Sequence, residues 1–152
     1  MDAYPRFRYM GSKFKLLPWL HETLQGLDFE SCTDAFSGSG VVSYLLKSMG
    51  KQVRANDVLH FPAVLTTATV ANSATQLTDE DLDVLLHAKA RKSQDHFIRK
   101  TFEGIFYTPE ELSFLDDVWA GIREMDSPLK RSLALAAILR SAIKRQPRGL
   151  FT

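Results

Sequence analysis

The chain has 152 residues, of which 45% are hydrophobic and 24% charged, and its net charge is +1. This is the profile of a soluble globular protein with one domain of ordinary size. The single cysteine, Cys32, excludes an internal disulfide, and the sequence has neither an apolar run long enough for a membrane span nor an apolar N-terminal signal. We therefore expect a cytoplasmic protein with no membrane partner.

Positive charge gathers at the two ends of the sequence. Residues 1–20 contain four basic residues against Asp2 alone, and residues 127–152 contain six without an acid. Such ends give a local positive field and favour phosphate as a partner, although a solvated helix face has the same composition. The basic residues of the second group are Lys130, Arg131, Arg140, Lys144, Arg145 and Arg148.

The first half of the chain alternates between strand and helix patterns. A helix is predicted over 12–25, beginning at Ser12 or, because of Pro18, later. The strands and helices that follow are expected over 31–36, 40–49, 52–56 and about 60–72. This order is typical of the opening of a doubly wound α/β sheet.

The second half is predicted to be helical. Thr78 precedes three acids, which suits a helix N-terminus, and Thr108 with Glu111 forms a capping box. The expected helices cover about 78–89, 93–103, 108–125 and 128–145. Two parallel strands alone do not make a stable sheet, so we expect the chain to be the first part of something longer.

The stretch TDAFSGSGVV, at residues 33–42, predicts a strand that turns sharply into a helix beneath a ligand. Gly38 and Gly40 let the backbone approach that ligand, and Asp57, at the end of the next strand, could accept both hydroxyls of a ribose. A dinucleotide site would favour a third glycine where Ser43 stands, and no Walker loop is present. These exclusions leave a cofactor that contains a ribose but no pyrophosphate, and S-adenosylmethionine fits this description best. The structural alternative is that the glycines only allow tight packing.

Three segments, RYMGSKFKLLPWL, TDAFSGSGVVSYLL and VRANDVL, occur in the order seen in a known enzyme class. With the later FYTPEELSFLDD and KRQPRGLFT, the chain resembles the D12 class of adenine-N6 DNA methyltransferases, which contains the Dam methylases. The resemblance implies a partial Rossmann-like methyltransferase sheet followed by a mainly helical segment. It also implies S-adenosylmethionine as the cofactor and DNA as the substrate.

The resemblance assigns cofactor contacts by position. Tyr9 and Lys13 would touch the cofactor from the N-terminal segment, and Asp57 would hold the ribose. The methionine part would be cradled by Asp34, Phe36, Ser37, Gly38 and Gly40. A packed aromatic is the structural alternative for Tyr9, a solvated charge for Lys13, and a helix-terminus acid for Asp34.

The catalytic Asp-Pro-Pro-Tyr segment of this class does not occur in these 152 residues, since no two prolines adjoin. No catalytic residue is therefore assigned. We expect residues 1–75 to be the cofactor-binding part and 76–152 a helical segment that is either a DNA-recognition insertion or a lid over the sheet. A further C-terminal half or a companion chain would carry the catalytic segment.

Other classes of function fit the sequence to different degrees. A cytosine-C5 mechanism is excluded because Cys32 lies inside a predicted strand, and no histidine spacing predicts a metal site. A nicotinamide-dependent enzyme is a third alternative. A non-catalytic module of this fold that binds DNA or a partner subunit is the main alternative. The residues predicted to follow a phosphate backbone are Arg140, Lys144, Arg145 and Arg148.

Overall fold

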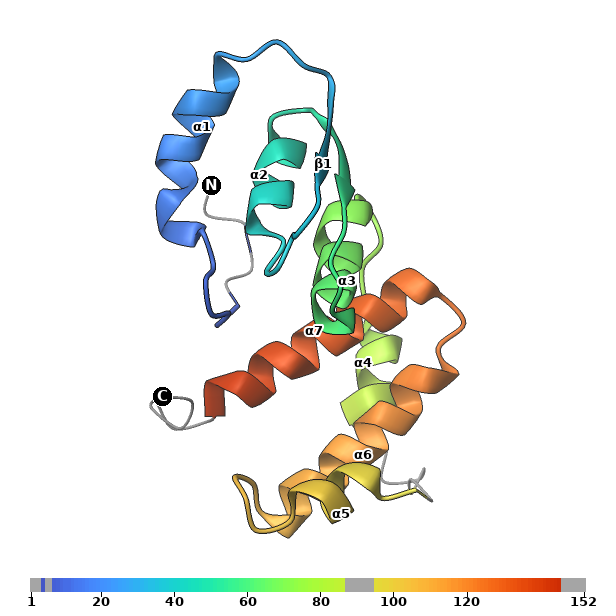
Figure 1. Cartoon of the computed structure of the whole chain (residues 1–152). Coiled ribbons are helices and arrows are strands. Elements are labelled where there is room, and N and C mark those ends of the chain that lie inside the picture. The colour runs from blue at the N-terminus through green and yellow to red at the C-terminus, as the bar shows by residue number, and fades with distance from the viewer. Residues whose placement is uncertain (1–3, 5–6, 87–94, 146–152) are drawn as a thin grey trace.

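The computed structural model describes Tyr4 and residues 7–86 and 95–145. Two short parallel strands lie beside each other, β1 (Ser31–Asp34) and β2 (Gln52–Ala55), with Ser31 opposite Gln52. Helix α2 (Val41–Ser48) connects them and packs against β2 (Figure 1). This strand, helix and strand order confirms an α/β arrangement in the first half of the chain.

The elements of the first half begin close to their predicted positions. A short 3₁₀ turn, η1 (Phe14–Leu16), leads into α1 (Leu17–Gln25), so the helix starts late, as Pro18 indicated. Helix α3 (His60–Thr66) continues as the π-helical turn η2 (Thr67–Ala71).

The second half consists of helices in the part of it that the structure describes. These are α4 (Asp79–Leu86), α5 (Phe97–Phe102), α6 (Pro109–Glu124) and α7 (Pro128–Arg145). The capping box of α6 is confirmed, since Thr108 and Glu111 bond each other's backbone N–H groups. Helix α5 begins at Phe97, later than the predicted 93, and residues 87–89 and 93–94 of the predicted helices lie outside the described residues.

Helix α7 packs against both halves of the chain. Its Ala136 belongs to a buried cluster with Phe7 of the N-terminal segment and with Leu65 and Ala68 of α3 and η2. Its Ala134 belongs to a second cluster, completed by Leu85, Val118 and Ile122 of α4 and α6. In Figure 1, α7 passes beneath α3 while α5 and the start of α6 extend away from the strands.

An ion pair joins the beginnings of α4 and α7. Lys130 Nζ lies 2.7 Å from Asp81 Oδ2, and the same carboxylate accepts hydrogen bonds from the backbone and side chain of Thr78. The bond from Lys130 and those from Thr78 lower the pKa of Asp81 to about 2. The N-terminal ends of the two helices therefore lie next to each other.

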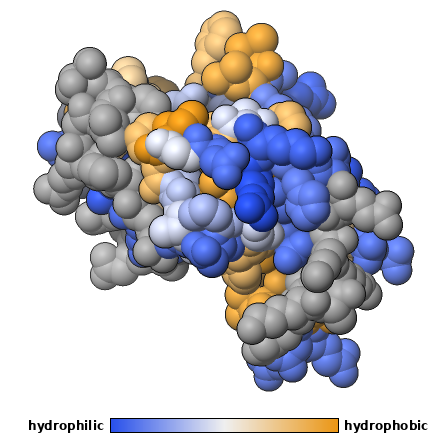
Figure 2. Space-filling model, turned by 90° about the horizontal axis from the view of Figure 1, so that it is seen from below, coloured by the Kyte–Doolittle hydropathy of each residue, from blue (hydrophilic) through white to orange (hydrophobic). Residues whose placement is uncertain are grey.

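The sheet has two strands within the described residues, both short, and their side chains alternate between exposed and half-buried. Seen from below, hydrophilic residues form a band across the middle of the molecule, with apolar patches at two edges (Figure 2). No helix in the described part of the chain combines the length and apolar character that a membrane crossing requires.

Candidate cofactor site at the glycine turn

The turn between β1 and α2 is fixed to the end of β2 by backbone hydrogen bonds. The N–H of Asn56 donates to the carbonyl of Asp34, and the N–H of Ser37 donates to the carbonyl of Asn56, both at 2.8 Å. Gly38 and Gly40 have φ angles of +49° and +75°, in the left-handed region that favours glycine. The turn thus lies directly beyond the carboxyl ends of both strands.

Asp57 closes this loop from the side of β2. Its Oδ2 accepts the N–H of Gly38 at 2.8 Å, and its Oδ1 accepts the N–H of Leu59 at 3.0 Å. The bond from Leu59, and next that from Gly38, lower the pKa of Asp57, so the carboxylate stays charged at neutral pH. Each oxygen can accept a further hydrogen bond, which leaves room for a ligand hydroxyl.

Asp34 holds the start of α2. Its Oδ2 accepts the hydroxyl of Ser43 at 2.6 Å, and the Ser43 side chain is completely buried. The serine that stands where a dinucleotide site would favour a third glycine therefore has a defined partner. This contact matches the helix-terminus alternative for Asp34 and leaves its other oxygen for a ligand.

The N-terminal segment lies against the same loop. A Cβ on Gly38 would come within 3.1 Å of the Tyr9 ring, so the ring and the loop backbone are in close contact. The hydroxyl of Tyr4 donates to the carbonyl of Ser39, and the hydroxyls of Ser12 and Ser39 lie 3.2 Å apart. Burial raises the pKa of Tyr4, which therefore stays a neutral donor at physiological pH.

The structure brings most of the predicted cofactor residues together. Those in one continuous contact network are Tyr9, Asp34, Ser37, Gly38, Gly40 and Asp57. Lys13 lies at the edge, where its ammonium donates to the carbonyl of Gly11, and the Phe36 side chain is 85% exposed. Sequence reasoning missed Tyr4, Ser12 and Ser39 because their contacts join residues far apart in the chain.

Of the four residues predicted to contact DNA, two have described side chains. Arg140 is half-buried on α7, and Lys144, one turn later, is exposed. The Nε atom of Arg140 is buried without a hydrogen-bond partner among the described residues. The side chain of Arg145 and all of Arg148 lie outside the described part of the chain.

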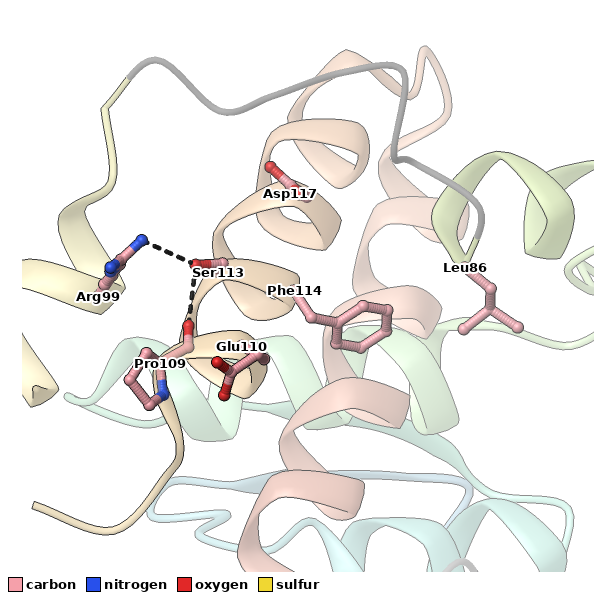
Figure 3. A pocket seen from close by; sticks show the side chains of 7 residues that line it. All are labelled: Leu86, Arg99, Pro109, Glu110, Ser113, Phe114 and Asp117. Atoms are coloured by element: carbon pink, nitrogen blue, oxygen red, sulfur yellow. Dashed lines mark hydrogen bonds between the residues drawn. The ribbon is translucent and has the colours of Figure 1, made fainter. Parts of the chain in front are cut away.

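A separate cavity of about 380 Å³ opens in the helical half (Figure 3). Arg99 of α5 donates to Ser113 of α6 on one side of it, and Phe114 of α6 faces Leu86 of α4 on the other. None of the predicted cofactor or DNA residues lines this cavity.

Comparison with known proteins identifies the family to which the chain is similar. A model of the D12 class N6 adenine-specific DNA methyltransferases matches residues 9–146. Type II methyltransferase M2.HphI of Haemophilus parahaemolyticus is 32% identical over 149 residues, which are 98% of this chain and 43% of that protein. The chain thus spans less than half the length of this relative, and no solved structure matches it. The match over nearly the whole chain places it in the family of D12 class N6 adenine-specific DNA methyltransferases.

Proposed function

We propose that this chain is the cofactor-binding part of a DNA methyltransferase that uses S-adenosylmethionine to methylate adenine at N6. The observation that carries the proposal is the junction of Asp57 with the glycine turn, at the carboxyl ends of both strands. The similar protein M2.HphI is described as a Type II methyltransferase, which supports the same activity and a role in restriction and modification. Such an enzyme would act in the cytoplasm, on DNA.

The residues of the turn fit the cofactor. The Ser37 hydroxyl is buried without a partner among the described residues, and a bound carboxylate or amino group would supply one. A Cβ at Gly38 or Gly40 would lie only 3.1 Å from the Tyr9 ring or 2.9 Å from the Thr66 methyl carbon, so both glycines let these side chains pack closely against the loop, whichever ligand binds there. The first amides of α2 lack acceptors within the helix and favour negative charge.

Each part of the site would then have a distinct task. Asp57 would accept the ribose hydroxyls, and Asp34 with the backbone of residues 36–40 would orient the methionine part. When bound, the cofactor supplies a methyl group on a positively charged sulfur. The protein's contribution in this chain is to hold that group in one place with its electrostatic surroundings fixed.

Transfer of the methyl group would require residues beyond these 152. The Asp-Pro-Pro-Tyr segment is absent from the sequence, and β1 pairs only with β2 in the described structure. We propose that a further segment, in the same protein or in a companion chain, adds strands to this sheet and brings the catalytic groups to the glycine turn. The greater length of M2.HphI supports this arrangement.

Helix α7 would contribute phosphate contacts. Arg140 and Lys144 are four residues apart and so share one side of the helix. Replacement of Lys144 by Gln should weaken binding to a mixed-sequence DNA duplex. It should also reduce the slope of log K against log salt by about 0.9, the value for one lost phosphate contact. Ser141→Ala removes no charge and should leave the slope unchanged.

The test of the cofactor site is calorimetric titration with S-adenosylhomocysteine. Asp57→Ala should weaken binding about 10- to 100-fold, because hydrogen bonds to a charged group are lost. The 2′-deoxy analogue should bind the parent protein more weakly than S-adenosylhomocysteine does, while the variant should no longer distinguish the two ligands. Asp28→Ala, an exposed acid away from the turn, is the control.

If the folded parent binds neither ligand, the non-catalytic module becomes the better description. If Asp57→Ala retains the preference for the 2′-hydroxyl, then Asp57 does not contact the ribose. Circular dichroism of each variant establishes that the fold is intact before affinities are compared.

A further inference from the structure

Phe61 lies in the first turn of α3, four residues after Asp57, and has no role in the assignments above. Its half-buried ring packs on the buried cluster that contains Leu65 and Ala136. The ring also lies nearly parallel to that of Tyr9, with centroids 6.1 Å apart and an angle of 10° between the planes. Phe61 therefore connects the buried core to the N-terminal segment.

Tyr9 in turn contacts the backbone of the glycine turn. Three atoms of its ring and hydroxyl lie within 3.6 Å of the position that a Cβ on Gly38 would occupy. Gly38 is the residue whose N–H donates to Asp57. A displacement of the Tyr9 ring would thus change the surroundings of the amide that joins the turn to the ribose-binding acid.

We propose that Phe61 is a positioning residue for the cofactor site, which acts by holding the Tyr9 ring against Gly38. This proposal rests on the cofactor function proposed above. Phe61 itself need not touch the cofactor. Parallel aromatic rings attract each other beyond the area they bury, so loss of the Phe61 ring leaves Tyr9 with contacts on the glycine turn alone.

The contacts of Phe61 also explain why it suits this task. Phe61 packs on a buried cluster on which Leu133 of α7 also packs. A ring that is itself held by the core gives Tyr9 a fixed surface. Leucine at position 61 would still fill much of the volume but would offer no ring face.

The experiment compares Phe61→Leu with Phe61→Tyr, which keeps the ring, and with Phe7→Leu, which changes another buried aromatic of the same cluster. The first readout is the NMR shift of the Gly38 amide, which senses the ring current of Tyr9. Phe61→Leu should move this signal, whereas Phe61→Tyr and Phe7→Leu should leave it near its parent position. Phe61→Met replaces Phe61→Leu if that variant does not fold.

The second readout is the affinity for S-adenosylhomocysteine. Phe61→Leu should lower it by about two- to tenfold, the size expected for one aromatic pair, and Phe61→Tyr should restore it. An unchanged Gly38 signal or an unchanged affinity in Phe61→Leu would overturn the proposal. If the parent protein does not bind the ligand, the cofactor function fails, yet the Gly38 signal still decides whether Phe61 positions Tyr9.

Discussion

Replacement of Gly40 by alanine tests whether the glycine turn is required by its geometry. The residue has a φ of +75°, and a Cβ there would lie 2.9 Å from the methyl carbon of Thr66, which is buried. The left-handed conformation costs a non-glycine residue about 1–2 kcal/mol. Forcing a methyl group into a packed site adds about 1–3 kcal/mol. Gly40→Ala should therefore reduce the free energy of unfolding by about 2–5 kcal/mol.

Two further variants separate these contributions. Gly50 has a φ of +79° with nothing within 4 Å of its Cβ position, so Gly50→Ala should show only the conformational cost of about 1–2 kcal/mol. Thr66→Ser removes the methyl group that meets Gly40 and keeps the hydroxyl that donates to the carbonyl of Pro62. In the Gly40→Ala background this second change should recover about 1–3 kcal/mol, the overlap part of the cost.

Urea unfolding followed by circular dichroism gives the four free energies of the cycle formed by Gly40→Ala and Thr66→Ser. The two changes should be non-additive, because they share one contact. An interaction energy below about 0.5 kcal/mol, which is ordinary additivity, would refute the steric reasoning. Equal losses in Gly40→Ala and Gly50→Ala would refute it as well.

Two other substitutions have defined outcomes. The pKa of Asp81 is lowered in the folded protein, so its ion pair with Lys130 stabilises the fold above about pH 4 and is lost as the pH falls toward 2. Asp81→Asn should therefore flatten the loss of unfolding free energy over that range, and an unchanged pH profile would contradict this. Asp116 is 1% exposed and accepts the N–H groups of Ile98 and Arg99 at 2.8 and 2.9 Å. Asp116→Asn should cost about 1–3 kcal/mol in urea unfolding, because a buried donor loses its acceptor, and a change below about 0.5 kcal/mol would contradict that role.

Local sequence signals predicted the elements that depend on neighbouring residues. The capping box of Thr108 and Glu111 was found because its partners are three residues apart. Pro18 likewise indicated the late start of α1. The glycine turn and Asp57 were recognisable because their spacing reflects one strand, helix and strand unit.

The features that the sequence did not predict depend on contacts between residues far apart in the chain. In the first turn of α5, the N–H groups of Ile98 and Arg99 donate to the carboxylate of Asp116, which lies in α6. The π-helical end of α3 is accompanied by Lys47 of α2, whose ammonium donates to the carbonyls of Thr69 and Asn72. Neither partner can be identified without the three-dimensional arrangement.

The same limit applies within the candidate site. The order of residues along the chain predicts the acids and glycines that a ligand would touch. It does not predict the side chains that hold these residues in place. Tyr4 donates to a carbonyl 35 residues away, and Phe61 stacks on a ring from the N-terminal segment. Such supports have no characteristic spacing, so only packing reveals them.

The pairing of Asp81 with Lys130 has a consequence for the changes in length that the helical half of this chain can accept. The chain between these two residues leaves the strand-containing half and returns to the point of departure, where the two side chains meet at 2.7 Å. Doubling the length of a loop whose ends are held together in this way costs only about 0.6 kcal/mol in chain entropy. Provided that Leu85 and Ile122 still pack on α7, α5 and the outer part of α6 can be lengthened, shortened or exchanged while the glycine turn keeps its shape.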